Sequence, residues 1–161
     1  MTHMTDNSTP APAGSQQLTV FLAVPDCAKA IDFYVACFGA EPVTRYDGPD
    51  GTVAHAELRF GDSLVQLGDP SPENGIVAPP GTGNCYTMTF WTSDVDEVFA
   101  RALAAGATEV TPVTDAFTGD RMGILRCPFG VRWCIARHDR DVSEEEIAAI
   151  AAEWSSHSAQ D

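Results

Sequence analysis

The sequence is short of positive charge. Its 161 residues include 23 acidic side chains against nine basic ones, so the formal net charge is −14, and Lys29 is the single lysine. The pI near 4.4 argues against nucleic acid and anionic membrane surfaces as partners, because both are polyanions. No apolar run approaches the ~18 residues of a membrane-spanning helix. A neutral or cationic small molecule is therefore the expected partner of a globular chain of ordinary domain size.

Cysteine pairs of the metal-binding or redox kind are missing as well. The five cysteines are odd in number and scattered, and no C-x-x-C pair occurs, which argues against a zinc knuckle and a thioredoxin motif. Their apolar surroundings indicate buried free thiols in a reducing cytosol. They are Cys27, Cys37, Cys85, Cys127 and Cys134. The sequence also has no dinucleotide-binding G-x-G-x-x-G after a strand, no Walker loop and no G-x-S-x-G elbow.

The first 17 residues have no apolar stretch of the kind found in a signal peptide. They are rich in Ser, Thr, Pro, Ala and Gln, a composition typical of a disordered segment. We therefore expect a disordered lead-in at 1–17 and a cytoplasmic protein.

Residues 18–138 repeat one order of elements twice. Apolar residues at helical spacing, glycine helix ends and turn signals between β-rich runs mark the elements. The first half (18–68) predicts strands at Leu18–Val24, Pro42–Tyr46, Val53–Phe60 and Ser63–Gly68, and a helix from its cap Asp26 to Gly39. The second half (85–138) predicts strands at Cys85–Trp91, Glu109–Thr114, Met122–Arg126 and Arg132–Arg137, and a helix from its cap Asp94 to Gly106. This order predicts an α+β fold of two tandem βαβββ modules, joined by a Pro/Gly-rich linker at 69–84.

Residues 139–161 have a different character and predict a short acidic helix with a polar tail. Ser143 and Glu146 have the spacing of a capping box, as do Asp94 and Glu97 in the second module. The tail segment holds seven acids and one base, so nearly half of the net charge lies outside the modules. This distribution weakens the electrostatic case for a cationic ligand. The helix would carry Ile147, Ile150 and Trp154 on one stripe.

Particular segments of both halves point to a known family. They are Val24–Asp26, Ala30–Tyr34, Phe38–Glu41, Ser93–Asp96, Ala105–Ala107, Gly119–Gly123, Cys127–Trp133 and Asp141–Glu146. With these segments, residues 18–148 resemble the vicinal-oxygen-chelate superfamily, which includes glyoxalase I, bleomycin-resistance proteins and extradiol dioxygenases. The tail is similar to tails of its PhnB-like branch. Cys127 and Val131 depart from the D-P-F-G-H motif that the branch usually carries at this place.

The resemblance implies curved mixed sheets around a concave cavity, and homodimers whose modules pair within or between chains. It also implies four positions for metal ligands, which here are Thr19, Gln66, Thr87 and Cys134. Hydroxyls and a neutral amide are poor ligands for a divalent metal, and a lone thiol needs a nearby charge or a metal to ionise. We therefore expect no cofactor, while an unusual divalent-metal site that uses Gln66, Cys134 and His55 stays open.

Strand alternation indicates which side chains would line the cavity. Trp91 shares its parity with Thr87 and Thr89, whereas Trp133 has the opposite parity from Cys134 and should lie in the core. An aromatic wall would suit a flat conjugated ligand, although aromatic side chains more often fill a core. The expected ligand-binding residues on the strands are Thr19, Phe21, Gln66, Thr87, Thr89, Trp91 and Cys134.

Two further residues have alternative interpretations. His55 is either a general base or ligand contact, or a hydrogen-bonded strand histidine for which the sequence identifies no carboxylate partner. Arg121 begins a strand that should line the cavity, so it either holds a ligand carboxylate or phenolate or forms an ion pair with Asp120 or another acid.

Three functions follow from these observations. The first is a metal-free protein that binds a small, aromatic or conjugated molecule, either sequestering a drug as antibiotic-resistance proteins of this superfamily do, or binding a metabolite. The second is a metal-dependent lyase, isomerase or dioxygenase. The third is a metal-free enzyme that uses His55 or Arg121.

Overall fold

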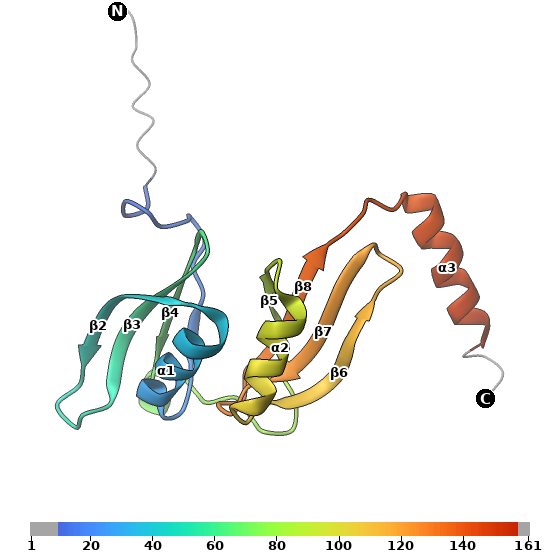
Figure 1. Cartoon of the computed structure of the whole chain (residues 1–161). Helices are drawn as coiled ribbons and strands as arrows, with labels where there is room; N and C mark the ends of the chain where they lie inside the picture. Colours follow the sequence, from blue (N-terminus) through green and yellow to red (C-terminus); the bar gives the residue numbers. More distant parts are fainter. Residues whose placement is uncertain (1–9, 158–161) are drawn as a thin grey trace, which may run out of the picture. The chain divides into compact units, whose positions relative to one another are not determined.

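Two compact units make up the chain, and the division between them falls between Pro79 and Pro80, inside the predicted linker. Figure 1 shows this computed structural model, which describes residues 10–157. Each unit contains a strand, a helix and three further strands, and a third helix follows in the second unit. The predicted α+β class with two tandem βαβββ modules is thereby confirmed.

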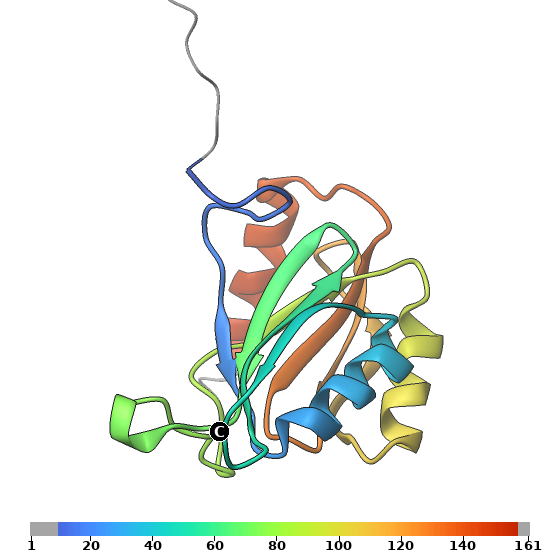
Figure 2. The same cartoon turned by 90° about the vertical axis from the view of Figure 1, so that its left-hand side faces the viewer.

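The first unit, unit 1, consists of a four-stranded mixed sheet and one helix. Its elements are β1 (Phe21–Ala23), α1 (Cys27–Phe38), β2 (Glu41–Asp47), β3 (Val53–Phe60) and β4 (Ser63–Gly68). The strand order is β1-β4-β3-β2, with β1 parallel to β4 and the other pairs antiparallel. A short 3-10 helix, η1 (Pro72–Asn74), lies in the linker. In Figure 2 the blue helix α1 lies beside the strands of this sheet.

Alternation along β3 and β4 decides which face of this sheet α1 covers. One set of side chains is buried: Ala56, Leu58, Phe60, Val65 and Leu67. The rings of Tyr34 in α1 and Phe60 meet edge to face, with centroids 5.7 Å apart. Burial of a large apolar side chain stabilises the fold by about 1.5–3 kcal/mol, so this face forms the core. The opposite face, which we call the helix-free face, carries the side chains of the other parity.

The second unit, unit 2, repeats the arrangement. Its elements are β5 (Met88–Trp91), α2 (Val95–Ala104), β6 (Thr108–Asp115), β7 (Asp120–Arg126), β8 (Arg132–His138) and α3 (Glu144–His157). The strand order is β5-β8-β7-β6, with β5 parallel to β8. Trp133 is buried and pairs with Leu125 across β7 and β8, which confirms its predicted place in the core.

Gly123 allows α2 to approach this sheet closely. A Cβ atom at this position would lie 2.8 Å from both Phe99 Cε2 of α2 and Val113 Cγ2 of β6. Gly123 pairs with Ile135 in the register of β7 and β8. The face that carries Gly123 is therefore the face that α2 covers, and the face that carries Cys134 is the helix-free face of unit 2.

The two module helices begin at the predicted aspartates, but the predicted side-chain caps are wrong. Asp26 and Asp94 are the N-cap residues, and neither side chain makes a capping hydrogen bond. Their φ/ψ values are 51°/47° and −104°/44°, whereas a capping side chain reaches the helix from the extended region. The Asp94 carboxylate instead accepts a hydrogen bond from the Ser93 hydroxyl. At α1 the Asp69 carboxylate accepts from the Cys27 N–H, at 3.2 Å.

The predicted capping box of the third helix is confirmed. The Glu146 N–H donates to Ser143 Oγ at 3.2 Å, and the Ser143 N–H donates to Glu146 Oε2 at 3.4 Å. Trp154 of α3 meets the ring of Phe117 edge to face, with centroids 4.9 Å apart. Within residues 10–157, none of the helices combines the length and the apolar composition that a bilayer span requires. The predictions for residues 1–9 and 158–161 lie outside the described residues.

The first strand of each unit is shorter than predicted. The Gln16 side chain bonds both backbone groups of Leu64, accepting from its N–H at 3.1 Å. The Gln66 N–H of β4 donates to the Val20 carbonyl oxygen at 3.0 Å, so the segment before β1 meets the sheet through both a side chain and the backbone. The disordered lead-in at 1–17 stays a prediction, with Gln16 in contact with the sheet near its end. In unit 2, β5 begins only at Met88, and the preceding Cys85 is exposed rather than buried. The other four cysteines are buried free thiols, as predicted.

Candidate functional site

The helix-free face of unit 1 gathers polar and aromatic side chains from all four strands. Glu57 pairs with Gln66 of β4 on one side and with Thr44 of β2 on the other, and Tyr46 pairs with His55. Phe21 of β1 pairs with Gln66. The register therefore places Phe21, Gln66 and His55, three of the predicted ligand-binding residues, on one face. Thr19 precedes β1, and its hydroxyl donates to the Gln16 carbonyl at 3.4 Å.

Glu57 is the centre of this face. Gln66 Nε2 donates to Glu57 Oε1 at 3.2 Å, and Thr44 Oγ1 donates to Oε2 at 3.1 Å. His55 Nε2 lies 3.5 Å from Oε1, with the two side chains 32% and 20% exposed. The hydrogen bond from Gln66 contributes most to lowering the pKa of Glu57, so this carboxylate stays ionised at neutral pH. His55 thus has the carboxylate partner that the sequence did not identify.

Two aromatic rings lie near His55. The centroid of the Phe21 ring is 6.0 Å from that of the imidazole, and the centroid of the Tyr46 ring is 6.2 Å from it. Gly68 leaves room for Phe21, because a Cβ at that position would lie 2.9 Å from Phe21 Cζ and 2.8 Å from the Ala54 carbonyl oxygen. An imidazole with its carboxylate partner therefore lies on a strand between the strands of two aromatic residues.

A hollow of 480 Å³ adjoins Phe21 within the same unit. It is formed by the turn between β2 and β3, the start of β3, and the segment after β4. Its lining is Phe21, Gly48, Pro49, Asp50, Thr52, Val53, Ala54, Asp69, Pro70, Ser71, Glu73, Asn74 and Ile76. A volume of this size is typical of small-molecule sites. The lining contains three carboxylates and no Lys, Arg or His, so it disfavours an anionic ligand.

The helix-free face of unit 2 carries the other predicted strand residues. Thr89 pairs with Cys134 and Trp91 with Ala136, and the Trp91 side chain is 58% exposed. Thr87 precedes β5, and its hydroxyl accepts a hydrogen bond from Arg132. Burial raises the pKa of the Cys134 thiol, so it stays protonated at neutral pH.

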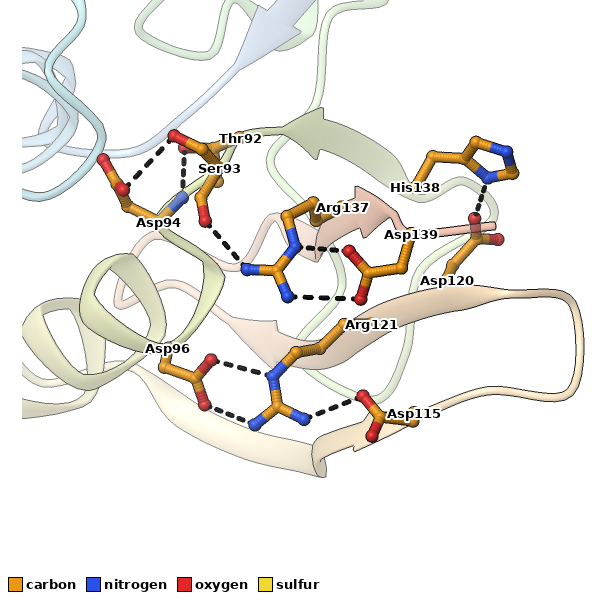
Figure 3. Close-up of polar contacts among 10 residues, drawn as sticks. All are labelled: Thr92, Ser93, Asp94, Asp96, Asp115, Asp120, Arg121, Arg137, His138 and Asp139. Atoms are coloured by element: carbon orange, nitrogen blue, oxygen red, sulfur yellow. Dashed lines mark hydrogen bonds and ion pairs between the residues drawn. The ribbon is translucent and has the colours of Figure 1, made fainter. Parts of the chain in front are cut away.

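Arg121 is not on this face, which corrects its predicted place in the cavity wall. Its parity is that of Gly123, so it points to the side of α2 (Figure 3). Its Nε and one terminal nitrogen donate to the Asp96 carboxylate at 2.8 and 2.6 Å, and the other terminal nitrogen donates to Asp115 at 2.9 Å. These hydrogen bonds raise the pKa of Arg121 further above its ordinary value. Of the two interpretations, the ion pair is the one that the structure shows.

A second ionic cluster in unit 2 was not foreseen. His138 Nδ1 lies 2.7 Å from Asp120 Oδ1, and Nε2 lies 2.8 Å from Asp141 Oδ1. Arg137 Nε donates to Asp139 at 2.5 Å, and another guanidinium nitrogen donates to the Ser93 carbonyl oxygen at 3.0 Å (Figure 3). The hydrogen bonds to the two aspartates raise the pKa of His138. Because both ring nitrogens are engaged, this cluster fastens β8 to β7 and to the connection before α3.

The four metal-ligand positions do not suit a divalent metal. Thr19 and Gln66 belong to unit 1, and Thr87 and Cys134 belong to unit 2. The Gln66 amide is already oriented toward Glu57, and the Cys134 thiol is neutral. Across residues 10–157, no group of three or more His, Cys, Asp or Glu side chains is arranged to hold an ion. The donors present are thus unlike the His and carboxylate sets that bind such metals.

Comparison with known proteins places this fold in a family. The profile of the Glyoxalase/Bleomycin resistance protein/Dioxygenase superfamily matches residues 16–135. The chain belongs to this superfamily. The predicted resemblance to this superfamily is thereby confirmed over residues 16–135.

Relatives of this superfamily member occur in bacteria and plants. This chain is 42% identical over 136 residues to an uncharacterized protein of Mycobacterium tuberculosis, and the matched region covers 82% of this chain and 80% of the relative. The crystal structure of TioX from Micromonospora sp. ML1 is 35% identical with a TM-score of 0.61, over 77% of this chain and 99% of that one. The PhnB protein from Bacillus cereus, at 23% identity and a TM-score of 0.58, covers 76% and 99% and shares the fold.

Sequence reasoning missed Glu57, Thr44 and Tyr46 in this site. Glu57 had a usable signal, since residues 55 and 57 of a strand lie on the same face. Thr44 and Tyr46 had none, because β2 contains register shifts that the sequence does not reveal.

Proposed function

We propose that this superfamily member binds a small, planar, conjugated molecule without a metal. The observation that carries the proposal is the helix-free face of unit 1, where an ionised Glu57 orients His55 close to two aromatic rings. Flat aromatic surfaces favour flat ligands, and a few fixed polar groups give orientation. The exposed Trp91 adds a further stacking surface in unit 2. Either a drug or a metabolite fits this description.

Metal chemistry of the family finds little support in the side chains present. A metal-dependent lyase, isomerase or dioxygenase would require Gln66 and Cys134 to leave their present roles as a hydrogen-bond donor and a buried neutral thiol. Metal analysis of the purified protein tests this directly. We expect far less than one metal ion per chain, and stoichiometric zinc, nickel, iron or manganese would contradict the proposal.

A second candidate is a metal-free enzyme in which His55 acts as a general base. The pairing of His55 with Glu57 favours it, because a carboxylate that orients an imidazole also stabilises the imidazolium formed when the ring takes up a proton. Arg121 is less suited to this role, since Asp96 and Asp115 engage its guanidinium.

A thermal-shift screen tests the binding proposal. Planar neutral and cationic aromatics should raise the Tm in a concentration-dependent way, because a ligand that binds only the folded state stabilises it. Phe21→Ala tests the face of unit 1 and Trp91→Ala tests that of unit 2, and at least one of them should reduce the shift given by the strongest ligand. Trp154→Ala is the matched control, since Trp154 is similarly exposed (62%) but lies on α3. Ligand shifts that both strand variants leave intact would contradict the assignment of these faces.

A further inference from the structure

One nitrogen of the His55 ring has no assigned role on the helix-free face of unit 1. Nε2 faces the Glu57 carboxylate at 3.5 Å. Among the side chains that the structure describes, none makes a hydrogen bond or an ion pair with Nδ1. An ionised carboxylate only accepts hydrogen bonds, so the proton of the neutral ring belongs on Nε2. Nδ1 is therefore left as an acceptor.

Aromatic rings from strands on either side of His55 define the shape of a ligand that can contact Nδ1. In the sheet order β1-β4-β3-β2, Tyr46 comes from the strand next to β3, and Phe21 comes from beyond β4 on the other side. Gly68 of β4 leaves the space that the Phe21 ring occupies. Both ring planes are tilted by only 32° and 35° from the imidazole plane. A flat molecule with a polar atom at its edge matches these surfaces.

The charges nearby restrict the polar atom further. Glu57 is ionised, and the adjoining hollow contributes Asp50, Asp69 and Glu73 without a basic side chain. Arg59 lies on the same face, but its guanidinium donates to the Gly14 carbonyl oxygen at 3.1 Å. A ligand that arrives as a carboxylate or phosphate anion would meet like charge. A neutral ligand that carries a hydrogen-bond donor would meet no such repulsion.

We propose that the molecule bound here carries a phenolic or enolic hydroxyl, which donates its hydrogen to Nδ1 of His55. This inference rests on the proposed binding function and names its ligand class. Glu57 is a positioning residue in this scheme, since it fixes the proton on Nε2 and strengthens Nδ1 as an acceptor. Gln66 and Thr44 in turn hold the Glu57 carboxylate in place.

The test compares three planar probes at neutral pH by equilibrium dialysis: beta-naphthol, its methyl ether and beta-naphthoate. Naphthol should bind about tenfold more tightly than its ether, the ratio expected for one well-placed hydrogen bond, and naphthoate should bind least. His55→Phe keeps a flat ring but has no acceptor nitrogen, so it should reduce the naphthol-to-ether affinity ratio to about one. Glu57→Gln should also lower the ratio, because an amide can donate to Nε2 and move the ring proton to Nδ1.

Matched variants keep the result interpretable. His55→Gln retains an acceptor and should recover part of the ratio, whereas a purely structural role for His55 would not distinguish it from His55→Phe. His138→Phe in unit 2 should leave the ratio as in the wild type, since both nitrogens of that ring are already paired. Each variant is first shown to be folded by its melting curve.

Two results would overturn the inference. Equal affinities for naphthol and its ether in the wild type, or a ratio that survives in His55→Phe, would refute the hydroxyl contact and leave the proposed binding function standing. Failure of all three probes and of every planar compound in the thermal-shift screen would refute the binding function itself, and the inference with it.

Discussion

Three side chains converge on the Glu57 carboxylate: the Gln66 amide and the Thr44 hydroxyl donate hydrogen bonds to it, and His55 Nε2 lies 3.5 Å from it. Their geometry turns one position of an ordinary strand into an oriented acid–imidazole pair. The sequence gives the spacing of residues 55 and 57 and hence their common face. The other partners depend on strand register, and the shift between Pro42 and Thr44 in β2 hides which residue of that strand lies opposite Glu57.

His138 offers a pH-dependent test at the scale of a single residue. Its pKa is raised above the ordinary 6.5, mainly by Asp120 and then Asp141, so its stabilising contribution is complete below pH 6.5 and is lost as the pH rises through the folded-state pKa. The pKa of Asp120 is lowered below the ordinary 3.8, so its own contribution disappears in acid.

We therefore expect His138→Gln to lower the Tm most near pH 5–6, with a difference from the wild type that shrinks in alkaline solution. Melting curves of both proteins across this range provide the measurement. A Tm difference that is constant with pH, or that grows toward alkaline pH, would show that the two carboxylates do not hold the charged ring.

At the scale of elements, turn signals and helix caps in the sequence predict the order of helices and strands well and their boundaries less well. Val53–Phe60 and Ser63–Gly68 are strands at the predicted residues, because clear turn signals enclose them. Asp26 and Asp94 occupy the N-cap positions of α1 and α2 as predicted, but their backbone angles prevent their side chains from capping the helices. The sequence leaves two interpretations of Arg121 open because the face that a strand residue occupies is fixed only by its partners, and these place Arg121 on the side of α2.

The close packing of α2 on the second sheet predicts a large cost at Gly123. Gly123→Ala should destabilise the protein by about 1–3 kcal/mol, because the new methyl group would overlap Phe99 and Val113. Urea denaturation measures this change in the free energy of unfolding. Adding Phe99→Leu should recover part of the loss through coupling between neighbours, whereas additive effects of the two substitutions would contradict the contact.

At the scale of the whole molecule, the acidic composition and the two-module organisation have different origins. The tail after β8 carries seven of the 23 acids, and several acids within the modules serve local ion pairs such as those of Arg121 and His138. The order of elements and family motifs predict the superfamily, which residues 16–135 match. They do not predict the ligand, since one fold supports many chemistries and the site depends on individual side chains.

Metal-free binding is the central claim, and a calorimetric titration of chelator-treated protein with beta-naphthol tests it most directly. The titration is run once without metal and once after adding an equivalent of zinc or manganese. We predict the same affinity in both runs, because His55 and Glu57 provide the contacts and the four family ligand positions hold no suitable set of donors. Binding that appears only when the metal is restored would contradict the account.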